Sequence, residues 1–216
     1  MKKHLVRLAA LAVLGSTATL AQAQNVYLGV GLPNVYAVGY AHPMGDSWGL
    51  RGEYAGGTSK STNGTSEGVN YEATFKSSRA GVFADWFAFG GGFRFVGGVT
   101  SNDTKLDVRG IGGPNTTIGS VTTDTTGKTF NVFIKYPTVT PYLGIGYGHQ
   151  KADKGLGFYF DLGVSFGSFT ADVQTDLVGY NGITQADIDE QKRKMNDALA
   201  KLSVLPSFST GLVYRF

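Results

Sequence analysis

The C-terminal stretch from Pro206 to Phe216 alternates strictly between two kinds of side chain. Successive side chains of a β-strand point to opposite faces, so an alternation of period two predicts a strand. The first face carries large apolar side chains at most of its positions, which are Phe208, Thr210, Leu212, Tyr214 and Phe216. The other face is mostly small or polar and carries Ser207, Ser209, Gly211, Val213 and Arg215. The sequence therefore predicts a final strand with one apolar wall.

A second stretch, from Leu156 to Gly167, repeats this alternation. Its apolar face has six large side chains, and its other face holds Asp161 among small residues. A soluble core could accept the apolar face, but Asp161 would then lie on an outer sheet surface. The pattern favours a membrane barrel, in which the apolar face meets lipid and the polar face points inward.

Weaker copies of the alternation occur along the rest of the chain, beginning near Val26, Tyr36, Trp48, Val69, Phe93, Phe130, Leu143 and Phe169. With the two clear strands they predict a closed antiparallel transmembrane β-barrel of 8–10 strands. Ten is favoured, because a tilted spanning strand needs only about 9–11 residues. If Pro137-Thr138 and Gly167-Ser168 are not tight turns, the count becomes eight. A change of register near Ser77 to Ala80 predicts a β-bulge.

The segments between strands predict two long loops and one helix. Residues 56–67 and 103–128 are rich in Gly, Ser, Thr and Asn, as polar loops are. Residues 184–202 have Thr184 as a cap, Asp187 near the third helical position and a partial apolar stripe. With an even strand number and a periplasmic C-terminus, this helix before the last strand lies outside. It could cover the barrel mouth as a lid or rest on its own hairpin.

The first 23 residues have the three parts of a secretory signal peptide. Lys2, Lys3 and Arg7 precede the apolar run from Leu8 to Leu14, and Ala21-Gln22-Ala23 supplies a cleavage pattern. The apolar run is too short for a transmembrane helix, which needs roughly 20 residues. We expect cleavage after Ala23, a barrel domain over residues 24–216 and a location in the bacterial outer membrane.

Removal of the signal changes the charge of the chain. The whole sequence has 19 basic and 16 acidic residues, but three of the basic ones lie in residues 1–23. The mature chain is therefore neutral, which gives no support to nucleic-acid binding. The chain has no cysteine, so it has neither disulfides nor thiolate metal sites. No apolar stretch after the signal is long enough for a helical span, so the chain can enter a membrane only as a closed barrel.

Several charged side chains fall on predicted inward faces. Mixed charges inside a narrow barrel should pair, because unpaired buried charge is costly. They could form a structural plug or line a selective solute pathway; the plug is favoured, because small barrels have little free interior. These residues are Arg51, Glu53, Glu72, Lys76, Arg94, Lys135, Asp161 and Arg215.

The sequence predicts no catalytic centre. His42 and His149 are the histidines left after signal cleavage, and neither has carboxylates beside it for a metal site. The serines cluster in predicted loops, without an arrangement of nucleophile, histidine and acid. We therefore predict no enzyme activity, no cofactor and no metal.

The ending Leu212-Val213-Tyr214-Arg215-Phe216 resembles the C-terminal signature of bacterial outer-membrane proteins. The segment Pro141 to Gly148 is similar to a proline-tyrosine-glycine strand of small barrels of the OmpA and OmpW kind. This resemblance implies that Leu212, Tyr214 and Phe216 form the signal recognised by the barrel-assembly machinery. It implies no functional site residue.

The sequence thus predicts an integral outer-membrane β-barrel surrounded by lipid and lipopolysaccharide. Its expected role is that of a narrow channel for small solutes or ions, or of a structural envelope component. The alternative is a surface interaction protein, an adhesin or receptor, that acts through the predicted 103–128 loop and the 184–202 helix.

Overall fold

A computed structural model describes residues 24–66, 69–150 and 154–216. None of the described helices is long and apolar enough to cross a membrane. The elements, in chain order, are β1 (Asn25–Leu32), β2 (Tyr36–Met44), β3 (Trp48–Ser66), β4 (Val69–Trp86), β5 (Phe93–Ile111), β6 (Thr116–Ile118), β7 (Val121–Thr123), β8 (Thr129–Lys135), β9 (Val139–Tyr147), β10 (Gly155–Phe166), β11 (Thr170–Thr175), α2 (Gln185–Ala200) and β12 (Val204–Arg215).

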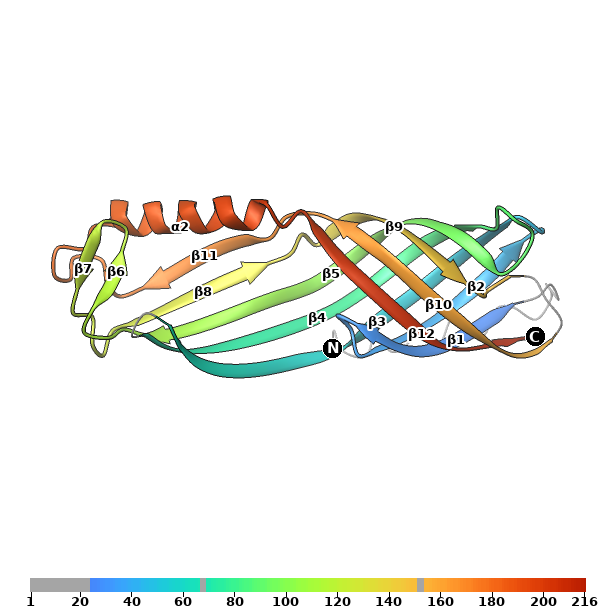
Figure 1. The fold of residues 1–216 in the computed structure, drawn as a ribbon, viewed down its shortest axis with the longest axis horizontal. Coiled ribbons are helices and arrows are strands. Elements are labelled where there is room, and N and C mark those ends of the chain that lie inside the picture. The colour runs from blue at the N-terminus through green and yellow to red at the C-terminus, as the bar shows by residue number, and fades with distance from the viewer. Residues whose placement is uncertain (1–23, 67–68, 151–153) are drawn as a thin grey trace, which may run out of the picture.

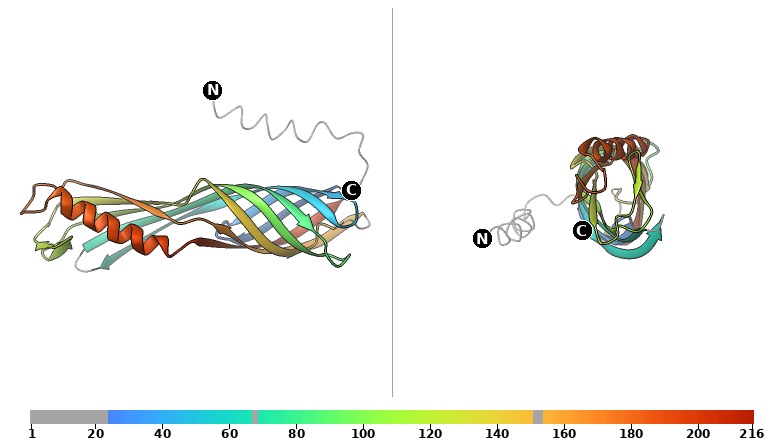
Figure 2. Two further views of the ribbon diagram at one scale, coloured as in Figure 1. Left: turned by 90° about the horizontal axis from the view of Figure 1, so that it is seen from above. Right: turned by 90° about the vertical axis from the view of Figure 1, so that its left-hand side faces the viewer.

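Eight strands close into a ring in the order β1-β2-β3-β4-β5-β9-β10-β12, and β12 pairs with β1 again. All neighbours are antiparallel; Asn25 of β1 faces Arg215 of β12, and Phe93 of β5 faces Tyr147 of β9. The ring forms a tube with tilted strands (Figures 1 and 2). The predicted fold class, a closed antiparallel barrel with one helix before the last strand, is confirmed.

The sheet has ten strands, but two of them continue beyond the ring. The first part of β5, up to Ser101, pairs with β9. The rest of the strand, from Lys105 onward, pairs with β8. The strand β11 likewise extends the line of β10 and pairs with β8. Pro137-Thr138 and Gly167-Ser168 therefore interrupt continuing strands, and the prediction that they are tight turns is wrong. The closed barrel therefore has eight strands, the lower of the two predicted counts and not the favoured ten; the sheet as a whole has ten strands because β8 and β11 lie beyond the ring.

Five of the eight strand lines project beyond the ring on the side away from the C-terminus (Figure 1). We call this part the half-barrel: residues 58–66 of β3, 69–77 of β4, 104–111 of β5, and all of β8 and β11. The predicted long loops fall mostly within it. Residues 56–66 and 103–111 are strand, and residues 116–123 contain the β6–β7 hairpin, so the loop prediction is wrong there.

The polarity of the two strand faces reverses along β4 and β5. In the ring, Val82 and Trp86 point outward and are exposed, while Phe83 and Asp85 are buried inside. In the part of β4 that belongs to the half-barrel, Tyr71 and Phe75 lie on the inner face and polar side chains lie on the outer face. Strand alternation is unbroken, so only the chemistry of each face has changed.

This reversal corrects three predicted interior charges. Glu72 and Lys76 of β4 are exposed on the outer face of the half-barrel, and so is Lys135 of β8. Their apolar neighbours were expected to face lipid. Beyond the membrane the outer face meets water, so the charged side chains occupy it and the apolar ones turn inward.

The predicted bulge lies in the partner strand. Ala55 faces Arg79 and Thr58 faces Ser77, so β3 has one extra residue opposite β4 at this level. Gly57 within the bulge has φ +85°, a conformation that glycine adopts without steric cost. The bulge stands where the ring gives way to the half-barrel, and β4 itself runs through without a shift.

The outer wall of the ring is a band of exposed apolar side chains. Leu28 is 63% exposed and Phe158 is 73% exposed, on the faces that alternation assigns to lipid. Two aromatic pairs mark the edges of this band. Trp48 stacks on Trp86 near the far end, with ring centroids 6.1 Å apart, and Tyr36 lies 6.3 Å from Tyr54 near the half-barrel. Aromatic girdles at both edges of an apolar band are typical of membrane barrels.

The helix α2 has the predicted cap and lies along β11 (Figure 1). Thr184 and Asp187 form a capping box, and hydrogen bonds from Thr184 lower the pKa of Asp187 to about 2. The Asn196 amide accepts from the backbone N–H of Ala171 at 2.8 Å and donates to its carbonyl at 3.0 Å. The helix therefore protects the edge of β11, a role close to the expected helix resting on its own hairpin.

Replacing an outward apolar residue by lysine should be costly only in the ring. Leu143→Lys places a charge on the lipid-facing band, where Leu143 is 57% exposed. We expect a loss of about 2–4 kcal/mol in unfolding free energy, as for lysine near the bilayer midplane. Urea unfolding from phospholipid vesicles measures it.

Ile111→Lys is the matched control, because Ile111 is 50% exposed on the outer face of the half-barrel. It should change the stability little, since water surrounds this position. Equal losses in the two variants would contradict the assignment of the membrane boundary.

Candidate functional site: a charged interior and an apolar cavity

Among the described residues, six charged side chains meet in the middle of the ring; five of them are buried and Arg79 is partly buried. They are three arginines and three carboxylates, so their charges cancel. Four strands supply them: Arg51 and Glu53 from β3, Arg79 and Asp85 from β4, Arg94 from β5 and Asp161 from β10. We call this set the ionic plug.

Arg51 is the centre of the ionic plug. Its guanidinium nitrogens lie 3.2 Å from Glu53 Oε2, 3.2 Å from Asp85 Oδ2 and 3.4 Å from Asp161 Oδ2. The Arg51 side chain is only 2% exposed. One arginine with its five donors thus joins carboxylates from three different strands across the lumen.

The other two arginines complete the pairing. Arg94 Nη2 lies 2.5 Å from Asp161 Oδ1, and Arg94 Nε lies 3.3 Å from Asp85 Oδ1. Arg94 Nη1 also donates to the Gly148 carbonyl at 2.8 Å. Arg79 Nη2 pairs with Glu53 Oε1 at 2.6 Å. Every carboxylate of the ionic plug therefore contacts at least two arginines, which offsets much of the cost of burying it.

Aromatic rings fill the space around these charges. The Tyr27 hydroxyl donates to Glu53 at 3.1 Å, and the Arg51 guanidinium lies 4.7 Å from the Phe83 ring centroid. Glycines make room for the rings: a Cβ on Gly39 would collide with Tyr27. A narrow eight-stranded barrel can hold these large side chains because the opposite wall is bare backbone at such points.

Above the ionic plug, toward the half-barrel, lies a layer of hydroxyl and amide side chains. Thr100 and Thr140 share a hydrogen bond of 2.8 Å, and Asn102 donates to Thr140 at 2.9 Å. Ser77 and Thr104 form another at 2.9 Å. A cavity at this level has a volume of about 10 Å³, which is room for no more than about one water molecule.

The structure brings together four of the charges that the sequence placed inside: Arg51, Glu53, Arg94 and Asp161. Arg215 is also buried, near Gly157 at the C-terminal end of the ring. The residues Leu212, Tyr214 and Phe216 are exposed on the outer wall, and their role in assembly stays a prediction.

Sequence reasoning missed Arg79 and Asp85. Both alternate in phase with Phe83 along β4, so the pattern alone would have placed them inside. The expectation that Tyr71 and Phe75 face lipid concealed this, because unbroken alternation along β4 puts these two residues on the same face as Arg79 and Asp85.

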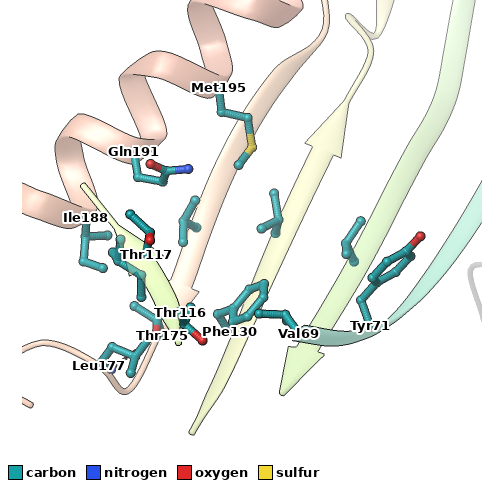
Figure 3. Close-up of a pocket in the computed structure, with 14 residues that line it drawn as sticks. Val69, Tyr71, Thr116, Thr117, Phe130, Thr175, Leu177, Ile188, Gln191 and Met195 are labelled. Atoms are coloured by element: carbon teal, nitrogen blue, oxygen red, sulfur yellow. Dashed lines mark hydrogen bonds between the residues drawn. The ribbon is translucent and has the colours of Figure 1, made fainter. Parts of the chain in front are cut away.

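A second feature is an apolar cavity of about 260 Å³ in the half-barrel (Figure 3). Its floor is the inner face of the sheet, its roof is α2, and its end is closed by strand β6 of the β6–β7 hairpin. Lining side chains include Val108, Val132, Val173, Phe130, Ile188 and Met195. The cavity is thus bounded by six elements, which are β4, β5, β6, β8, β11 and α2.

The fold and the site define a class: a closed eight-stranded antiparallel barrel with an apolar outer wall and a charged, filled interior, which is the construction of a membrane-spanning β-barrel. The same fold occurs in two crystal structures from Acinetobacter baumannii. CarO has a TM-score of 0.58 and 18% sequence identity, covering 93% of this chain and 100% of its own. CarO2 has a TM-score of 0.58 and 20% identity, covering 90% and 98%. No protein-family model and no curated protein matches the sequence.

Removing one carboxylate should destabilise the ring strongly. Asp161→Ala leaves Arg94 and Arg51 with an uncompensated buried charge. We expect a loss of about 3–5 kcal/mol in unfolding free energy, as for other broken buried ion pairs. Denaturant titration of the refolded barrel measures it.

Asp172→Ala is the control, because it removes the exposed ion pair with Lys192 on the outside of the half-barrel. It should leave the unfolding midpoint almost unchanged, since exposed pairs contribute little. A loss as large as that of Asp161→Ala would show that ion-pair burial is not the source of the effect.

Proposed function

We propose that this chain is an outer-membrane β-barrel protein whose ring is a closed anchor and whose function is binding at the half-barrel outside the membrane. The ionic plug is the observation that carries the proposal. It crosses the lumen from β3 and β4 to β10 through paired charges, with aromatic rings packed against it. A ring closed in this way holds the half-barrel in place but offers no solute path.

The outer-membrane location rests on several supports. The ring has an apolar outer wall with an aromatic pair at each edge, and its interior is polar. The predicted signal peptide of residues 1–23 lies outside the described residues. The likeness to CarO and CarO2 supports the barrel fold itself.

The side of the membrane follows from the ends of the strands. The C-terminal strand β12 ends at Arg215, at the end of the ring opposite the half-barrel (Figure 1). Outer-membrane barrels have short turns on the periplasmic side and longer segments on the external side. The short turns between β2 and β3 and between β4 and β5 lie at the C-terminal end. The half-barrel is therefore on the external side in this proposal.

The narrow channel is the second candidate function. The mixed-charge lumen favours it, because charged rings can select ions. Three arginines locked to three carboxylates would have to separate before a solute could pass. Binding at the half-barrel is therefore better supported than the narrow channel.

Single-channel conductance tests the closed ring. The refolded wild-type protein should give no steps in a planar bilayer. Arg94→Ala combined with Asp161→Ala keeps the net charge at zero but removes two buried side chains of the ionic plug. We expect this double variant to conduct, because water enters the space that they leave.

The matched control is Glu72→Ala combined with Arg109→Ala, which removes a cross-strand pair of opposite charges from the outer face of the half-barrel. This variant should stay silent. Steps from the wild-type protein would contradict the closed anchor and make the channel the leading function.

A further inference from the structure

We infer that the half-barrel cavity is a binding site for an uncharged amphiphile with a single unbranched alkyl chain, taken up from the external water phase. The inference rests on the proposed external position of the half-barrel. It gives the proposed binding function a chemical class of ligand.

The floor of the cavity is elongated across the sheet. Val173 of β11 faces Val132 of β8, and Val132 faces Val108 of β5. Tyr71 of β4 lines the same cavity on the next strand. Three steps between neighbouring strands of about 4.7–4.9 Å give a floor roughly 14 Å long. A floor of branched aliphatic side chains with this shape suits an extended hydrocarbon chain.

The next row of the floor pairs the aromatic side chain of Phe130 with a glycine. Phe130 of β8 faces Gly110 of β5. A Cβ on Gly110 would collide with the Phe130 ring, so the ring lies over the bare backbone at this point. The phenyl group of Phe130 therefore lies flat against the sheet and leaves the space beneath α2 open.

The roof of the cavity comes from α2, which points Ile188, Gln191 and Met195 toward the sheet (Figure 3). Ser120, in the turn of the β6–β7 hairpin, donates to Asp187 at 3.1 Å and fixes the start of the helix. Met195 is unbranched and flexible, so it can adapt to chains of different length. The roof is thus anchored at one end and adjustable at the other.

The electrostatics of the cavity select an uncharged ligand. None of its described lining residues carries a charge. Among the described residues, no hydrogen-bond partner is found for the side-chain amide of Gln191, which lines the cavity (Figure 3). An amide can donate to and accept from a hydroxyl, ester or amide head group. No lining residue offers a cation to pair with a carboxylate, so an uncharged head group fits this lining better.

The size and position of the cavity decide between ligand sources. Its volume of about 260 Å³ exceeds the roughly 150 Å³ of an apolar cavity that binds benzene. On β5 the outer face is already polar at Asp103, and Val108 stands five residues further out. At about 3.4 Å per residue the cavity lies roughly 17 Å beyond that point along the strand. Bilayer lipid does not reach it, so the ligand comes from the water phase.

The test is a methyl NMR titration of the mature protein in phospholipid nanodiscs. Decanol is the probe, and the methyl groups of Val108, Val132 and Ile188 report on the cavity. The chemical shifts of these methyl groups should change as decanol is added and then reach a plateau. The methyl groups of Val30 and Val82 face lipid and report decanol dissolved in the bilayer, which should not saturate. Cavity methyls that do not move, or that move only in parallel with the lipid-facing ones, would overturn the inference.

Two further probes test the ligand class. Decanoate at pH 8 should bind more than about tenfold more weakly, because its charge loses part of its hydration and finds no cation in the lining. Adamantanol, a compact alcohol, should bind more weakly than decanol, because it cannot extend along the floor. Equal binding of decanoate would overturn the uncharged head group, and equal binding of adamantanol would overturn the alkyl chain.

Variants of β8 give a matched pair. Val132→Trp fills the cavity and should abolish the saturable shifts of Val108 and Ile188. Asn131→Trp adds the same side chain on the outer face of the same strand and should bind decanol normally. Met195→Trp fills the cavity from the helix and serves if Val132→Trp does not fold. Normal binding by a folded cavity-filling variant would overturn the site.

Gln191→Leu tests the head group and should weaken decanol binding about fivefold, the usual effect of losing one neutral hydrogen bond. Unchanged affinity would remove Gln191 from the site. These outcomes are separate from the conductance test, since a silent barrel that binds no decanol keeps the closed anchor and loses only the alkyl ligand.

Discussion

The strands β4 and β5 pass through two solvents, and this constraint shapes both halves of the molecule. A strand fixes which residues share a face, but it does not fix which face is apolar. In lipid the outer face must be apolar, as at Val82 and Val99. In water the outer face carries Lys76 and Asp107, and the apolar side chains turn inward. The ionic plug and the apolar cavity are therefore two results of one alternation.

The interior of the ring differs from the core of a soluble protein, because its buried side chains are largely polar and charged. Charges inside eight strands cannot be left to water, since the lumen is too narrow. Arg51 pairs these charges by contacting carboxylates of three strands. Such a network stabilises only when it is complete, because each partner removed leaves another charge buried. The lumen is closed by the same pairing that makes its charges tolerable.

Local alternation was enough to predict the faces of β10 and β12, and capping residues were enough to predict α2. The half-barrel was not predictable in this way. The Ser-, Thr- and Gly-rich end of β3 has the composition of a loop, and it is a strand because β4 pairs with it residue by residue. The bulge at Gly57 shows the same limit. A register shift involves two strands, and the sequence of one strand does not show which partner carries the extra residue.

The number of strands that stop at the end of the ring explains why part of the apolar inner face of the half-barrel stays uncovered. Strands β1, β2 and β12 end at the membrane boundary, while five strand lines continue. A closed barrel would face those five lines with three more strands, but here α2 and the β6–β7 hairpin take that place. A helix and a short hairpin cover less sheet than three strands would. The cavity between Val108 and Met195 is what remains uncovered, and its apolar walls make hydrocarbon a better occupant than water.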